Sequence, residues 1–257
     1  MRASFFLTLL ILPASLSGCA KDYSLAPPPD SEHVTVTVKV PEQLLAETMN
    51  VMYRSPICTR ITHGASGQRI ELEGYHGIDM QPQREGQSDL FSVKLPIDGG
   101  GACSWHLANV TFGVAYKDPT HFGEDVFYGA GGGIVVIFDH NNSPRGGAEI
   151  EVDGDLNIKK DYYPWLHEKF QGGYEKYVNL AGEGSAYSVY QALQAKQVYF
   201  EPVLHSDFMM ISEEPKVHKI GDFIKFTYPD GSQRSDSSNK PNFRKLQLLR
   251  LSAEGKK

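Results

Sequence analysis

Apolar and polar positions alternate along much of the chain. In residues 33–40 every second position is a valine, from Val34 to Val40, and the positions between are polar. A period of two predicts a β-strand that buries one face. Four other segments alternate in the same way: 70–73, 91–95, 108–116 and 224–228. Residues 134–138 are apolar throughout, which is typical of a central strand, so we expect a mainly β fold built as an antiparallel β-sandwich-like domain or domains.

Turn signals separate these strands, and helical signals are few. Gly, Asn, Asp and Pro cluster at residues 64–67, 99–101, 141–144 and 230–232. One short helix is predicted to begin at Pro164 and end near Gln171. A second is predicted behind Ser185, because Val189, Ala192, Leu193 and Lys196 lie at helical spacing.

The composition fits a folded chain that does not bind nucleic acid. The 257 residues are 40% hydrophobic, enough for one large domain or two small ones. A division near residues 140–148, where Asn, Pro and Gly cluster, would separate two β-rich halves. The formal net charge of -6 leaves no excess of cations to neutralise a phosphate backbone.

The N-terminus reads as a signal peptide. Arg2 precedes an apolar stretch over residues 5–12, which is too short to span a bilayer, and the sequence LSGC follows at residues 16–19. This run resembles the lipobox of bacterial lipoproteins. The resemblance implies cleavage after residue 18 and lipid attachment to Cys19, and Ala20 behind it implies sorting to the outer membrane, facing the periplasm. The alternative is an ordinary secretory signal.

The mature chain would consist of a tether and a folded part. Residues 19–32, with prolines at 27–29, would form a semi-rigid spacer, and residues 33–257 the β-rich domain. Loss of Arg2 would take the side-chain charge from -6 to -7. In an oxidising compartment the remaining pair, Cys58 and Cys103, is expected to form a disulfide, and two buried free thiols are the alternative.

The sequence contains no convincing catalytic or metal motif. There is no G-x-S-x-G elbow, and the neighbours His205, Ser206 and Asp207 are no triad, because triad members converge from separate segments. No HExxH or CxxC spacing occurs. We therefore expect a protein that is not an enzyme and holds no metal or cofactor.

Aromatic side chains are concentrated between residues 162 and 190. Tyr162, Tyr163 and Trp165 open this segment and are our predicted partner contacts, because tyrosine and tryptophan dominate interface hot spots. The alternative is that the segment rims the hydrophobic core, with its tyrosine hydroxyls in water.

The order of several short motifs resembles a known family. LSGC, the proline-rich spacer, VTVTVKV, SPIC, GGGACSW and GVAY follow one another as in immunity lipoproteins encoded beside antibacterial type VI secretion lipases. The resemblance covers about the first half of the chain. It implies that the protein binds a secreted phospholipase effector in the periplasm and occludes its active-site cleft or lid. A structural or assembly lipoprotein of an envelope or secretion machine and a carbohydrate- or small-ligand-binding lipoprotein are the alternatives.

Overall fold

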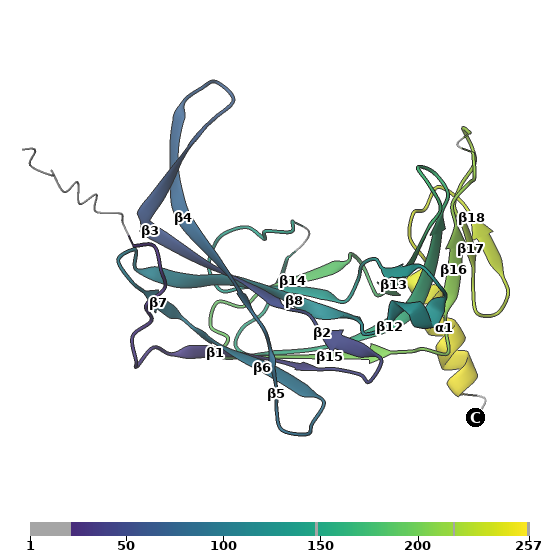
Figure 1. Cartoon of the computed structure of the whole chain (residues 1–257), viewed down its shortest axis with the longest axis horizontal. Coiled ribbons are helices and arrows are strands. Elements are labelled where there is room, and N and C mark those ends of the chain that lie inside the picture. The colour runs from purple at the N-terminus through teal and green to yellow at the C-terminus, as the bar shows by residue number, and fades with distance from the viewer. Residues whose placement is uncertain (1–21, 147–148, 218, 256–257) are drawn as a thin grey trace, which may run out of the picture.

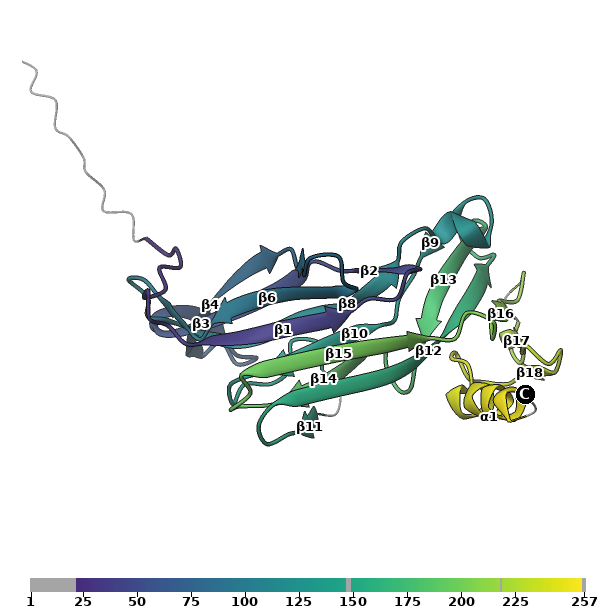
Figure 2. The same ribbon diagram turned by 90° about the horizontal axis from the view of Figure 1, so that it is seen from below.

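The protein is built mainly from β-strands, as expected. The computed structural model describes residues 22–146, 149–217 and 219–255, and 50% of the chain is strand and 7% helix. Two sheets lie face to face along most of the molecule, and the single α-helix packs at the C-terminal end (Figures 1 and 2).

Ten strands form the first sheet and eight the second. Those of the first are β1 (His33–Lys39), β5 (Gln83–Arg84), β6 (Leu90–Pro96), β9 (Val126–Tyr128), β12 (Leu156–Lys169), β13 (Glu175–Ala181), β15 (Gln197–Leu204), β16 (Met210–Glu213), β17 (Lys225–Thr227) and β18 (Gln233–Ser235). Those of the second are β2 (Leu44–Ala46), β3 (Met49–His63), β4 (Arg69–Met80), β7 (Asp98–Gly100), β8 (Trp105–Tyr116), β10 (Gly133–Ile137), β11 (Glu149–Glu151) and β14 (Tyr187–Gln191). A short 3-10 helix covers Pro119–Phe122, and α1 covers Phe243–Glu254.

The sheets are mixed rather than antiparallel, which corrects the expected pairing. Strand β1 runs antiparallel to β6 but parallel to β15, and β15 is parallel to β12. In the second sheet β10 is parallel to β14. Alternation along a strand determines which face is buried but not which neighbour it pairs with. Parallel neighbours need long crossover connections, and these pairs join strands far apart in the sequence.

Two hydrophobic cores share strand β12. The main core lies between the sheets and draws on residues from Val34 to Phe200, so it takes side chains from both sides of residues 140–148. The second core is smaller and lies at the C-terminal end; its buried members are Tyr163, Ala181, Met210, Phe226, Tyr228 and Leu246.

Both predicted helices are wrong. Residues 164–169 belong to β12, and Pro164 lies in the gap where β12 changes partner from β15 to β16, so its missing N–H interrupts no ladder there. Val189 lies in β14, where its branched side chain is buried. The α-helix forms instead at residues 243–254, behind Asn242, whose side chain accepts a 3.0 Å hydrogen bond from the Lys245 N–H.

A long twisted hairpin projects from the N-terminal end of the molecule (Figure 1). It is formed by β3 and β4, and its outer part, residues 56–75, is called the arm below. The expected disulfide joins Cys58 at the base of the arm to Cys103 in the turn before β8. Strand β3 bulges here between Ser55 and Arg60. Gly74 stands opposite the bulge, where a Cβ would come within 1.7 Å of the Cys58 carbonyl oxygen, so only glycine fits.

The proline-rich segment packs on the body instead of forming a free spacer. The Ala26 N–H donates to the Gly99 carbonyl oxygen at 2.9 Å, and Trp105 Nε1 donates to the Tyr23 carbonyl oxygen at 3.0 Å. At Gly100, where φ is +57°, a Cβ would come within 2.1 Å of the Ala26 carbonyl oxygen. Because Gly99, Gly100 and Gly101 have no side chains, residues 23–28 can pack closely against their backbone. A spacer role is left only to the residues before Tyr23.

Candidate functional site

The three predicted partner contacts lie on β12, but two of them point into the interior. Tyr162 is buried in the main core and Tyr163 in the second core, because a core lies on each side of this strand. Neither ring is available to a partner in this structure. Trp165 is half-buried, and its partner role stays a prediction.

Trp165 begins a chain of polar contacts that links β12 to β16. Its Nε1 donates to the Ser212 hydroxyl at 2.7 Å, and the same hydroxyl lies 2.7 Å from His167 Nδ1. His167 Nε2 lies 3.2 Å from a Glu214 carboxylate oxygen. Hydroxyl, imidazole and carboxylate follow one another as in a nucleophilic triad, but Ser212 is completely buried. No substrate atom can reach this hydroxyl, so the contacts serve to join the two strands.

Trp165 also lines a cavity of about 330 Å³. Its wall is mainly apolar and includes Leu180 and Phe243; its polar residues are Asn179, Ser185, Asn239 and Lys240. The Asn179 Oδ1 already accepts a hydrogen bond from the Ala130 N–H at 2.9 Å. The cavity is of a size that holds a small organic molecule.

Aromatic side chains are exposed at the turn between β12 and β13. The rings of Phe170 and Tyr174 lie 5.4 Å apart, and Lys216 Nζ stands 5.4 Å from the centre of the Phe170 ring. Tyr174 is 61% exposed, and Phe223, from the connection between β16 and β17, is 45% exposed. We call Phe170, Tyr174 and Lys216, together with Phe223 from the same connection as Lys216, the aromatic tip.

The predicted helix over residues 164–171 would end at this turn, whereas the structure has a hairpin turn between β12 and β13 there. The sequence signal is present: Gly172 and Gly173 separate Phe170 from Tyr174, and both glycines have positive φ. Two aromatic residues around a glycine pair at the end of an alternating strand indicate a hairpin turn rather than a helix end.

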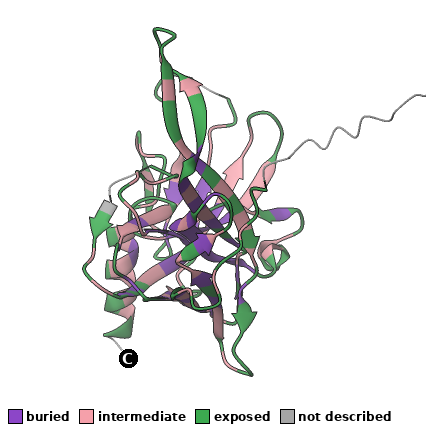
Figure 3. Cartoon of the chain, turned by 90° about the vertical axis from the view of Figure 1, so that its left-hand side faces the viewer, coloured by how far each residue is buried: buried purple, intermediate pink, exposed green. Residues whose placement is uncertain are grey.

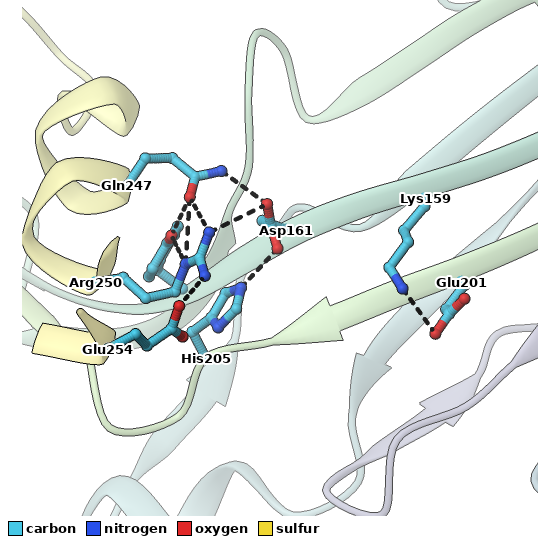
Figure 4. A network of polar contacts seen from close by, with 8 residues as sticks. Lys159, Asp161, Glu201, His205, Gln247, Arg250 and Glu254 are labelled. Carbon is cyan, nitrogen blue, oxygen red and sulfur yellow. Dashed lines mark hydrogen bonds and ion pairs between the residues drawn. The ribbon is translucent and has the colours of Figure 1, made fainter. Parts of the chain in front are cut away.

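A polar network connects α1 to β12, the strand that leads to the turn carrying Phe170 and Tyr174 (Figure 4). The two Asp161 carboxylate oxygens bind His205 Nε2 at 2.6 Å and Gln247 Nε2 at 2.7 Å. The Gln247 amide oxygen accepts hydrogen bonds from the Tyr163 hydroxyl at 2.8 Å and from Arg250 at 2.8 Å. The helix is thereby fixed to β12 by side-chain hydrogen bonds.

The network also changes the acidity of its carboxylate. Burial alone would raise the pKa of Asp161, but the hydrogen bonds from His205 and Gln247 and the charge of Arg250 outweigh it and hold that pKa below its ordinary value. The carboxylate is therefore ionised in the docked state.

Three further sequence predictions concern lipid attachment, metal binding and membrane-spanning helices. Cys19, the predicted site of lipid attachment, lies outside the described residues. Within the described ranges, no three His, Cys, Asp or Glu side chains are grouped so as to hold a metal ion. The same part of the chain has no helix long and apolar enough to cross a membrane.

Comparison of the chain with models of protein families, with curated proteins and with solved structures found no match.

Proposed function

We propose that this chain is a lipid-anchored immunity protein that binds a secreted antibacterial phospholipase in the periplasm and covers its active site. The observation that carries the proposal is the aromatic tip, which lies at the opposite end of the molecule from the first described residues (Figure 1). A chain anchored near residue 22 would present this end to molecules in the periplasm.

The aromatic tip has the properties of a binding hot spot. Tyr174 and Phe223 offer large apolar surface, and Lys216 places a charge against the Phe170 ring. The tip stands on a unit held by its own core and by the docked helix, so little conformational freedom would be lost on binding. The acidic net charge of the chain would speed encounter with a basic partner.

A small-ligand receptor is the second candidate, and the cavity beside Trp165 is the observation that favours it. Its size, its apolar wall and the nearby Lys240 suit a small amphiphilic molecule with an anionic group. A ligand of this kind would raise the unfolding temperature of the protein in a concentration-dependent way. A structural role in an envelope machine has no comparable site to support it.

Protection of cells provides the test. The proposal requires a phospholipase gene beside the gene for this chain. Its product is directed to the periplasm of a susceptible strain, together with the full-length protein. We expect growth to be restored by the wild type, and binding of the purified lipase to weaken roughly tenfold or more in the double variant Tyr174→Ala and Phe223→Ala.

Leu248→Ala is the matched control, because Leu248 is an exposed side chain of the same unit on α1. It should protect and bind as the wild type does. Failure of the wild-type chain to protect, or equal binding by the double variant and the control, would contradict the proposal.

A further inference from the structure

The arm carries apolar side chains that nothing in the described chain covers. Four of them are exposed, from 37% at Leu72 to 58% at Ile57, with Ile61 and Tyr75 between. Figure 3 shows the hairpin standing clear of the body, exposed or half-exposed along most of its length. Arg60 pairs with Leu72 and Ile61 with Glu71, so Leu72 and Ile61 lie on opposite faces of the hairpin, and both faces carry exposed apolar side chains. Such side chains on a projection indicate an apolar partner.

The chain enters the folded body at the base of the arm. The Tyr23 carbonyl oxygen is bound by the Trp105 ring, and the Trp105 ring lies 5.4 Å from that of His76 in β4. The first described residues and the arm are therefore separated by one side chain. The disulfide between Cys58 and Cys103 holds the two parts in this arrangement.

The distance from the predicted anchor to this point is short. Three residue steps separate Cys19 from Asp22, and even a fully extended chain covers only about 11 Å in three steps. The arm extends further than that, because the five residue steps from Cys58 to His63 in β3 span about 17 Å. A lipid on Cys19 would thus bring the arm within reach of the bilayer surface.

The charge of the arm differs from that of the chain as a whole. Residues 56–75 contain Arg60 and Arg69 against Glu71 and Glu73, a formal charge of 0, whereas the whole chain has -6. Neither arginine forms an ion pair within the described ranges, although Arg60 stands over the Tyr75 ring at 5.3 Å. Arginine and tyrosine beside isoleucine and leucine are the combination found at membrane interfaces.

The geometry points to the arm as a second membrane contact, in which Ile57, Ile61, Leu72 and Tyr75 enter the interface of the bilayer and Arg60 and Arg69 bind lipid phosphates. This contact adds to the partner-binding function and rests on the lipid at Cys19, not on the lipase. It would hold the body in one orientation, since a single flexible attachment leaves rotation free. The aromatic tip would then face away from the membrane.

The test places an environment-sensitive dye on the lipidated mature protein. In Ile61→Cys the new thiol is the only free one, because Cys58 and Cys103 are joined and Cys19 carries the lipid; Leu248→Cys on α1 is the control. Both proteins are incorporated into phosphatidylethanolamine and phosphatidylglycerol vesicles. We expect blue-shifted emission and quenching by brominated lipid at position 61, and neither at position 248.

Replacing Arg60 or Arg69 by a neutral residue measures the electrostatic contribution to membrane binding by the arm. Arg60→Gln and Arg69→Gln should each lower the ratio of bound to free arm roughly fivefold, seen as loss of the shift at position 61. A dye at position 61 that stays in water on the vesicles, or that shifts only when a lipase is added, would overturn the proposal; the second result would make the arm a protein-binding surface. Protein that does not float with the vesicles would contradict the anchor on which the proposal rests.

Discussion

The two ends of the molecule are held by different means. At the N-terminal end a disulfide, a glycine surface and the main core fix the arm and the entering chain. At the C-terminal end a core of six buried side chains, the pairing of β16 with β12 and the polar network around Asp161 hold α1 and β16–β18. The first end should therefore depend on oxidation, whereas the second should depend on a few side chains and on one ionised carboxylate.

The largest loss of stability should come from truncating a buried side chain in the second core. Phe226 is fully buried in β17, so Phe226→Ala should cost about 3–5 kcal/mol in the stability of the C-terminal end. Hydrogen exchange should rise in β16–β18 and α1 and stay low in β1 and β8. Exposed Phe223→Ala is the control and should change stability by about 0.5 kcal/mol or less. Equal loss of protection in β1, β8 and β16–β18 would show that the two cores unfold as one.

Removing the disulfide between Cys58 and Cys103 should destabilise the N-terminal end of the molecule. The double variant Cys58→Ser and Cys103→Ser should lose about 2–4 kcal/mol, because the open chain gains freedom on unfolding. Exchange should increase in the arm and at residues 23–28, with α1 unchanged. The same pattern should follow from adding a reductant to the wild type, and an unchanged arm would count against its role as a fixed projection.

Acid should weaken the docking of α1, by the smallest amount. The folded-state pKa of Asp161 lies below its ordinary value of 3.8, so its contribution is present above that pH and is lost as the pH falls through the lower, folded value. Asp161→Asn should mimic this change at neutral pH at a cost of about 1–2 kcal/mol. NMR signals of α1 followed against pH would measure it; docking of α1 that is as stable after Asp161 is protonated as before would contradict this role.

The strands were predictable from the sequence because their two faces meet different surroundings. In β1 the valines point to the main core and the threonines between them do not. The alternation of apolar and polar residues therefore matches the alternation in burial. The pattern failed on β12. Since cores lie on both of its sides, Tyr162 and Tyr163 are both buried, and adjacent aromatic residues looked like a surface.

The helix and the parallel pairs were not predictable for separate reasons. The signals for α1 are present in Asn242 and in the spacing of Phe243, Leu246 and Leu249, but they follow a polar stretch at the chain end and were overlooked. The pairing of β1 with β15 joins segments far apart in the sequence, and no local sequence pattern indicates it. The aromatic tip depends on the loop carrying Lys216 reaching Phe170, which is also a tertiary contact.

The most direct test of this division between the ends is hydrogen exchange of the lipidated protein on vesicles, before and after the lipase is added. The account predicts that vesicles alone protect residues 56–75, and that the lipase then protects the turn at residues 170–174 and the segment around Phe223. Protection of the arm by the lipase in place of the vesicles, or no protection of residues 170–174 by a bound lipase, would contradict it.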